Sequence, residues 1–188
     1  MKLNARLSIN EIFCNQSFVN RIKMKIHTQI LLGIILIMTS QAGAEDELGI
    51  IGEVYEDGFP VIYKFVNEMP VKDVRESLQW LTVISWKYDG SSNNGMPLSD
   101  ENQRMIILED AIEHYIENDG VLRHVYSRTG NSLKELVYYI HDQDQFLAEL
   151  NKALSTHKRY PIEISFYKDE KWEDFQKLLD DFATAVNK

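Results

Sequence analysis

The chain has a single cysteine, Cys14, among its 188 residues. This scarcity excludes a disulfide framework and a structural zinc site built from several thiolates. Basic side chains are also in the minority, with 20 Lys and Arg against 29 Asp and Glu. Because phosphate contacts need clustered Lys and Arg, the acidic balance argues against a nucleic-acid-binding protein. Hydrophobic residues still make up 44% of the chain and aromatic residues 11%, which is enough to build a packed core.

The sequence lacks a run long enough to span a membrane. The aliphatic stretch Ile30–Met38 has nine residues, less than half of the roughly 20 that a transmembrane helix needs. Basic residues precede it and Ala42-Gly43-Ala44 follows it, which is the pattern of a secretory signal peptide. We therefore expect cleavage after Ala44 and a periplasmic or secreted product with no stable membrane span. The alternative interpretation of the stretch is a buried core helix.

Met24 offers an alternative start of translation, because residues 24–44 have the length of an ordinary signal peptide. Residues 1–23 are then either an over-extended start or a long basic leader. Loss of residues 1–44 removes five basic side chains and one acidic one, which leaves 15 basic and 28 acidic groups, a charge of −13 over 144 residues. Such a surface favours solubility and basic protein partners.

Hydrophobic periodicity predicts an α+β domain over residues 59–188, preceded by a flexible acidic lead-in over 45–58. We expect strands over 59–66, 78–88, 121–127, 133–140 and 162–167. We expect helices from Ser99 to about 116, from Asp142 or Asp144 to about 154, and over 169–186, with 71–77 a short helical turn or a loop. From residue 78 the order is β-α-β-β-α-β and then a helix, which is typical of a ferredoxin-like core. The strand at 59–66 and the C-terminal helix are additions to that core.

Motifs of the common catalytic classes are missing. The sequence has no G-x-S-x-G, no S-x-x-K and no glycine-rich phosphate loop. The four histidines that remain after cleavage show no H-x-x-x-H spacing. We therefore expect a protein that is not an enzyme, with no catalytic or metal-binding residues and no cofactor.

One polar pair is a weak candidate site. If the turn between strands 121–127 and 133–140 lies at Thr129-Gly130, His124 faces Glu135 across the hairpin. An imidazole beside a carboxylate is a general-base arrangement, and it is equally a routine cross-strand pair on a solvated sheet face. A turn shifted by one residue would place the two side chains on opposite faces.

Two motifs resemble those of a known family. Asn94-Gly95-Met96-Pro97 ends a strand-to-helix loop, and Asp169-x-x-Trp172-x-x-Phe175 follows the last strand. With Tyr138-Tyr139-Ile140-His141-Asp142 between them and the order of elements, the chain resembles the bacterial "domain of unknown function 695" family over roughly residues 59–181. That family is in turn similar to the regulator of ribonuclease E activity B, a small ferredoxin-like inhibitor. The resemblance implies no activity, cofactor or catalytic residue. The expected role of the motif residues is structural: Gly95, Pro97, Asp169, Trp172 and Phe175.

These observations favour an exported, non-catalytic protein-binding domain of the adaptor, inhibitor or immunity type. Its expected partner is a basic protein and not a nucleic acid, and the sequence leaves its oligomeric state open. A sheet face not covered by the added strand or the last helix would be available to such a partner. The alternative is a small-molecule-binding or hydrolytic domain that uses His124, Glu135 and the loop Asp89–Pro97. A pocket with converging polar groups would favour this alternative.

Overall fold

The computed structural model describes residues 49–116 and 122–186. The expected signal peptide, its cleavage site after Ala44 and the alternative start at Met24 lie outside these residues. Within the described ranges, no helix is long and apolar enough to cross a membrane.

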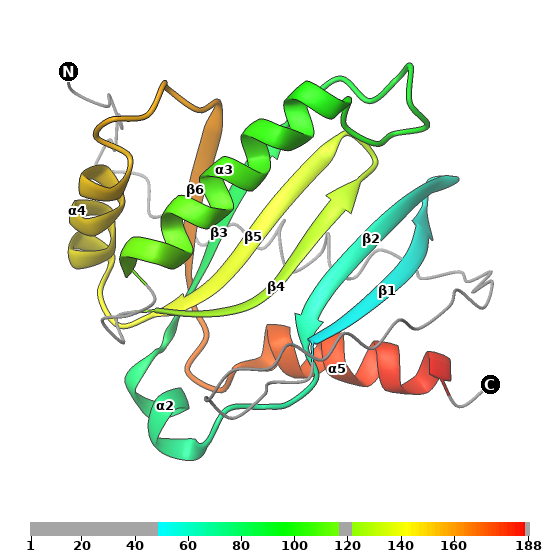
Figure 1. Ribbon diagram of the computed structural model, residues 1–188. Helices are drawn as coiled ribbons and strands as arrows, with labels where there is room; N and C mark the ends of the chain where they lie inside the picture. The colour runs from blue at the N-terminus through cyan, green and yellow to red at the C-terminus, as the bar shows by residue number, and fades with distance from the viewer. Residues whose placement is uncertain (1–48, 117–121, 187–188) are drawn as a thin grey trace, which may run out of the picture.

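The described chain has an α+β fold, as predicted, built on one open antiparallel sheet of six strands in the order β1-β2-β4-β5-β3-β6 (Figure 1). The strands are β1 (Gly49–Glu56), β2 (Phe59–Val66), β3 (Trp80–Lys87), β4 (Leu122–Gly130), β5 (Leu133–Ile140) and β6 (Ile162–Lys168). The described helices are α2 (Lys72–Ser77), α3 (Ser99–Ile116), α4 (Gln143–Ala153) and α5 (Glu173–Val186).

The N-terminal hairpin corrects the sequence analysis. Residues 45–58 are predicted to be a flexible lead-in, whereas 49–56 form β1 and pair with β2 from Gly49↔Val66 to Glu56↔Phe59. Asp57 and Gly58 make the two-residue turn with φ of 53° and 85°, the geometry that Asp-Gly favours in a tight hairpin. Glycines and glutamates interrupt the pattern of alternating apolar residues in β1, so the sequence gives only a weak strand signal there.

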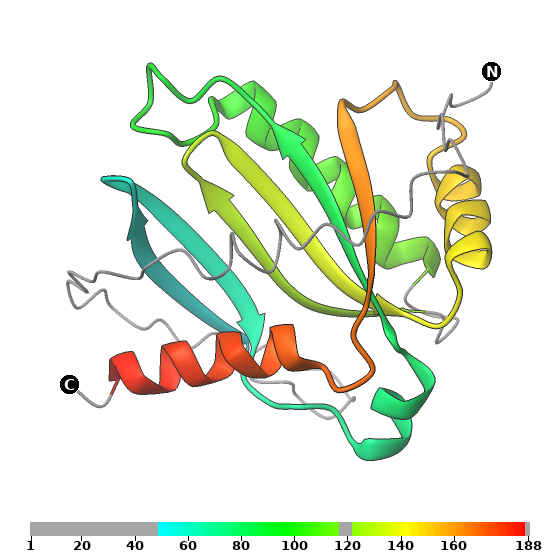
Figure 2. The same ribbon diagram turned by 180° about the vertical axis from the view of Figure 1, so that it is seen from behind.

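Helices cover both faces of the sheet. We call the face under α3 and α4 the first face and the face under α5 the second face; Figure 1 looks at the first face and Figure 2 at the second. Side chains of β3, β5, α3 and α4 bury one hydrophobic cluster on the first face. A separate cluster on the second face joins β2, β3, β4 and β5 to Trp172 and Phe175. The last helix therefore covers part of the face that a ferredoxin-like core would leave open.

Helix starts follow local side-chain chemistry. Of the two predicted caps of α4, Asp142 is the one that forms, because its Oδ1 accepts a hydrogen bond from the backbone N–H of Gln145 at 2.8 Å. The last helix is predicted to begin at Asp169 but begins at Glu173. The reason is Trp172, which takes a left-handed backbone conformation with φ of 59° and so cannot continue a right-handed helix.

Candidate functional site

The hairpin of β4 and β5 does not form the predicted His124–Glu135 pair. Its turn lies at Asn131-Ser132, both with positive φ, so Arg128 pairs with Glu135. His124 lies opposite Tyr138, with ring centroids 5.0 Å apart on the first face. Glu135 alternates with the first-face residues of β5 and therefore points to the second face.

Gly130 explains why the turn is shifted. It is a strand residue with φ of 147°, and a Cβ at this position would collide with the backbone of Pro60 and Val61 in β2. The glycine is therefore needed for close approach of β2 to β4, and the turn falls on the next two residues. Asn and Ser give a weaker turn signal than Gly, which is why sequence reasoning misplaced the tip.

Arg128 organises an ion-pair network on the second face. Its guanidinium contacts Glu56 at 2.5 Å and Glu135 at 3.8 Å, and the residue is only 7% exposed. The hydroxyl of Tyr63 donates to Glu56 at 3.1 Å, and that of Ser85 donates to Glu135 at 3.3 Å. Burial, together with the charge of Glu56, raises the pKa of Tyr63 above its usual 10, and the phenol stays neutral. The network cross-links the five neighbouring strands β1, β2, β4, β5 and β3. It contains no activated nucleophile.

The Asp169–Trp172–Phe175 motif fastens α5 to the sheet, and we call it the tryptophan clasp. Asp169 accepts hydrogen bonds from the backbone N–H of Glu173 and from the hydroxyl of Tyr139, at 2.9 and 2.6 Å. The indole of Trp172 stacks on the Tyr139 ring, with centroids 3.7 Å apart and planes within 6°. Its Nε1 donates to the carbonyl of Leu78 at 2.8 Å. These contacts join the start of α5 to β5 and to the chain after α2.

The Gly95 motif fastens the other end of the sheet, and we call it the glycine clasp. The carbonyl of Gly95 accepts from the backbone N–H of Ser132 at 2.8 Å and from the hydroxyl of Tyr88 at 2.9 Å. Gly95 has φ of 78°, and a Cβ there would press on Phe59 and on the backbone of Asn131. Pro97 is buried, and its carbonyl accepts from the Asn93 side chain at 3.0 Å. The loop 89–97 thus holds the β4–β5 turn and offers no phosphate cradle.

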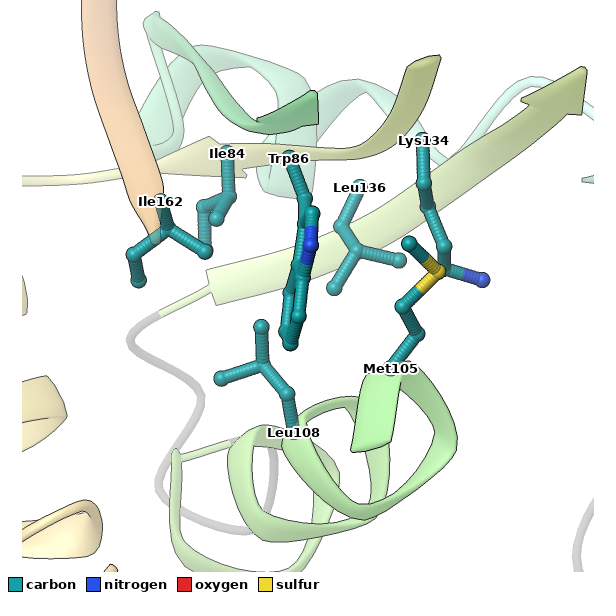
Figure 3. A pocket seen from close by; sticks show the side chains of 7 residues that line it. All are labelled: Ile84, Trp86, Met105, Leu108, Lys134, Leu136 and Ile162. Carbon is teal, nitrogen blue, oxygen red and sulfur yellow. The ribbon is translucent and has the colours of Figure 1, made fainter. Parts of the chain in front are cut away.

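A buried ion pair and a small cavity lie under α3. Lys134 of β5 and Glu109 of α3 are 2.8 Å apart, with side chains 9% and 13% exposed. The neighbouring cavity measures about 10 Å³, roughly the space for one water molecule. Figure 3 shows its lining, which apart from Lys134 is apolar: Ile84, Trp86, Met105, Leu108, Leu136 and Ile162. The cavity is far smaller than a site for a metabolite.

His124 lies on the first face with one ring nitrogen buried. Its Nε2 is buried and has no hydrogen-bond partner in the described part of the chain. Burial lowers the pKa of its imidazole below the usual 6.5, and the charge of Glu109 opposes this shift. Because the pKa is lowered, the ring is neutral at pH 7. Among residues 49–116 and 122–186, no group of three or more His, Cys, Asp or Glu is placed to hold a metal ion.

The first face is uncovered over the β1–β2 hairpin, where no helix lies in front of the two strands (Figure 1). Ile51 is 39% exposed there and Tyr55 52% exposed. Register places both on the first face, beside Lys64 and Pro60 of β2. We call this surface the open face and define it by residues Ile51, Glu53, Tyr55, Ile62 and Lys64.

The molecule is thus an α+β domain whose motif residues join helix to sheet and loop to hairpin. Residues 52–179 match a family described as "Family of unknown function (DUF695)". The match covers more than half of the chain, and the chain belongs to this family. No curated protein and no solved structure matches it. These comparisons give no evidence for the expected similarity to the regulator of ribonuclease E activity B.

Proposed function

We propose that the chain is an exported, non-catalytic protein-binding domain of the adaptor, inhibitor or immunity type. The observation that carries the proposal is the open face. Large apolar side chains of β1 are exposed there, beside an edge of the sheet, whereas equivalent side chains of β3 are buried. Exposed apolar surface at a strand edge is typical of protein interaction sites.

The polar groups support the same proposal, because they already serve the fold. Arg128, Asp169 and Lys134 are each held by side chains of other elements at hydrogen-bond or ion-pair distance. None of the three faces a described cavity large enough for a substrate. A binding function that uses surface shape and charge needs no converging catalytic groups.

The alternative function, a small-molecule-binding or hydrolytic domain, has one observation in its favour: the buried Nε2 of His124 has no partner in the described structure. Its other expected elements lie apart. Glu135 points to the second face, and the loop 89–97 packs on the β4–β5 turn. The three therefore do not converge on one reacting atom.

We also infer that β3, α3, β4, β5, α4 and β6 form a ferredoxin-like core. Two observations support this inference. The strands run in the order β4-β5-β3-β6 with antiparallel neighbours throughout. The helices α3 and α4 pack on the same face. The β1–β2 hairpin extends that sheet beside β4, and it is this extension that presents the open face.

A pull-down from envelope extract tests the function. The tagged protein, expressed from its full reading frame, is compared with Ile51→Thr and with the control Ile107→Thr, which changes an isoleucine of α3 that is 43% exposed. We expect one stoichiometric basic partner whose capture falls at moderate salt and with Ile51→Thr only. Absence of any partner above background would contradict the proposal, and ligand-induced thermal shifts would then test the alternative.

A further inference from the structure

The outer edge of β1 is set up to accept another strand. In a two-residue hairpin the closing residues, here Glu56 and Phe59, exchange both backbone hydrogen bonds. The pattern alternates along the strand, so the N–H and C=O groups of Ile51, Glu53 and Tyr55 point away from β2. β1 is also the first strand in the sheet order, with no described strand on its other side.

The sequence of β1 lacks three features that commonly block an edge, which are proline, lysine and a bulge. Residues 49–56 contain no proline and no lysine, and their pairing with β2 runs without a bulge over all eight residues. The opposite edge differs. β6 begins directly after Pro161, ends at Lys168 and is one residue shorter. An incoming strand therefore finds a longer and less protected template at β1.

The charges around β1 select the partner. Glu53 is exposed on the open face, and Asp57 is exposed in the turn that ends the strand. Lys64 of β2 is the one cation among the residues that define the open face. The carboxylates of Glu53 and Asp57 outnumber it around β1. With residues 45–188 at −13, a second copy of this chain would bring like charges to the edge. A basic strand would bring opposite ones.

We propose that β1 binds an extended, basic segment of a partner protein as a seventh strand. Every second residue of that segment lies on the open face, and these residues alternate between apolar side chains against Ile51 and Tyr55 and a cation against Glu53. Main-chain hydrogen bonds supply the affinity, and the alternate side chains supply the selectivity. The inference rests on the proposed function, since it names the surface and the partner class of the same protein-binding domain.

A peptide titration tests the edge directly. The probe is a labelled peptide KTVTKTVTK, and the control peptide is ETVTETVTE, read by fluorescence anisotropy with protein from the full reading frame. Glu53→Pro removes both the carboxylate and the outward N–H, whereas Glu53→Thr removes the carboxylate only. A proline fits this position, because the outward N–H makes no bond to β2. We expect Glu53→Pro to bind the basic probe at least about fivefold more weakly than Glu53→Thr does.

Amide hydrogen exchange of the wild-type protein keeps the test decisive if Glu53→Pro does not fold. The basic probe should slow exchange at Ile51, Glu53 and Tyr55, which point outward, and leave Gly52 and Val54 unchanged. The proposal is overturned by equal binding of the acidic peptide or by equal affinity of the two Glu53 variants. It is also overturned by protection of the three outward amides before any peptide is added, since another segment or a second copy then holds the edge.

The pull-down separates this inference from the function on which it rests. A partner captured equally by the wild type and by Glu53→Pro would overturn the edge proposal and leave the protein-binding function standing. Absence of any partner would overturn the function and this inference together.

Discussion

β1 and β3 belong to the same sheet, but the fold uses their apolar side chains differently. β3 is buried on both faces, with Leu81, Val83, Ile84 and Trp86 nearly inaccessible to solvent. β1 has no fully buried residue, and every second one is exposed. The difference comes from position, because β3 lies between β5 and β6 under helices, whereas β1 lies at the edge. Apolar side chains that the fold does not bury are the ones available to a partner.

The comparison extends to how each region is held. The region of β3 and β5 is fixed by the tryptophan clasp at one end and the glycine clasp at the other. The β1–β2 hairpin is held through β2, which pairs with β4 and buries Val61 and Phe65 on the second face. Beyond its pairing with β2, β1 is held by the Glu56–Arg128 ion pair and by Phe182 against Gly52. The first region should therefore set the global stability, and the hairpin should tolerate substitution on its open face.

Removal of the tryptophan clasp should have the largest effect. Trp172 is fully buried, stacks on Tyr139 and donates to the carbonyl of Leu78. We expect Trp172→Ala to lower the free energy of unfolding by about 4 kcal/mol, measured by urea denaturation. Trp172→Gly should be less damaging by about 1 kcal/mol, because glycine accepts the positive φ without strain. Equal losses in the two variants would contradict the role of the backbone conformation.

Breaking the ion pair between Lys134 and Glu109 under α3 should give the next largest loss of stability. Lys134→Met leaves the largely buried Glu109 without its ion-pair partner, and we expect the free energy of unfolding to fall by about 3 kcal/mol. The double variant Lys134→Met, Glu109→Gln should recover most of it, because no buried charge remains. The matched control is Lys152→Met, which breaks an exposed pair with Glu149 and should cost less than about 0.5 kcal/mol. A Lys134→Met loss no larger than that of the control would show that the pair is solvated.

The sequence predicts the region of β3 and β5 better than it predicts the hairpin. The strand over 133–140 and the cap at Asp142 are confirmed, because strong β-formers and a polar cap act locally. In the hairpin, only the strand over 59–66 is confirmed. β1 was missed, because an edge strand needs no continuous apolar pattern. The His124–Glu135 register failed because the close approach of β2 fixes Gly130 within the strand, a constraint that lies in another part of the chain.

In the candidate site too, the sequence predicts what local motifs determine and misses what distant parts of the chain determine. Gly95, Asp169 and Trp172 stand out as motif residues, and the structure places each in a clasp. Arg128 gave no signal of its own, because its network joins Glu56 and Glu135, which are 72 residues and seven residues away in the sequence. Only the strand order, which the sequence does not specify, brings these charges together.

Asp174, which lies at the start of α5, should make the free energy of unfolding depend on pH. Burial raises the pKa of its carboxyl from the ordinary 3.8 to about 6, with Asp169 adding to the shift and the Tyr126 hydroxyl opposing it. The folded state therefore binds this proton more tightly than the unfolded chain does. Its contribution to stability is present below about pH 4 and is lost as the pH rises to about 6. The expected loss is about 3 kcal/mol.

Asp174→Asn should remove this part of the pH dependence, because an amide still accepts from Tyr126 but does not ionise. Urea denaturation between pH 4 and 8 measures it, and the variant should be at least as stable as the wild type at pH 8. Asp180→Asn is the matched control, since that carboxyl is exposed on the same helix. A wild-type pH profile that Asp174→Asn leaves unaltered would contradict the assignment.

Substitutions on the open face should have the smallest effect on the free energy of unfolding. They test directly whether the apolar side chains of β1 and β3 have different roles. Ile51→Thr and Tyr55→Thr keep the β-propensity of an edge strand, and they change side chains that are already 39% and 52% exposed. We expect each to change the free energy of unfolding by less than about 0.5 kcal/mol, whereas Val83→Thr in β3 should cost about 2 kcal/mol, because it buries a hydroxyl at a nearly inaccessible position. If the β1 variants keep their stability but lose the basic peptide, these side chains serve binding. If they lose stability to the same extent as Val83→Thr, the hairpin is part of the core, and its exposed residues need no partner to explain them.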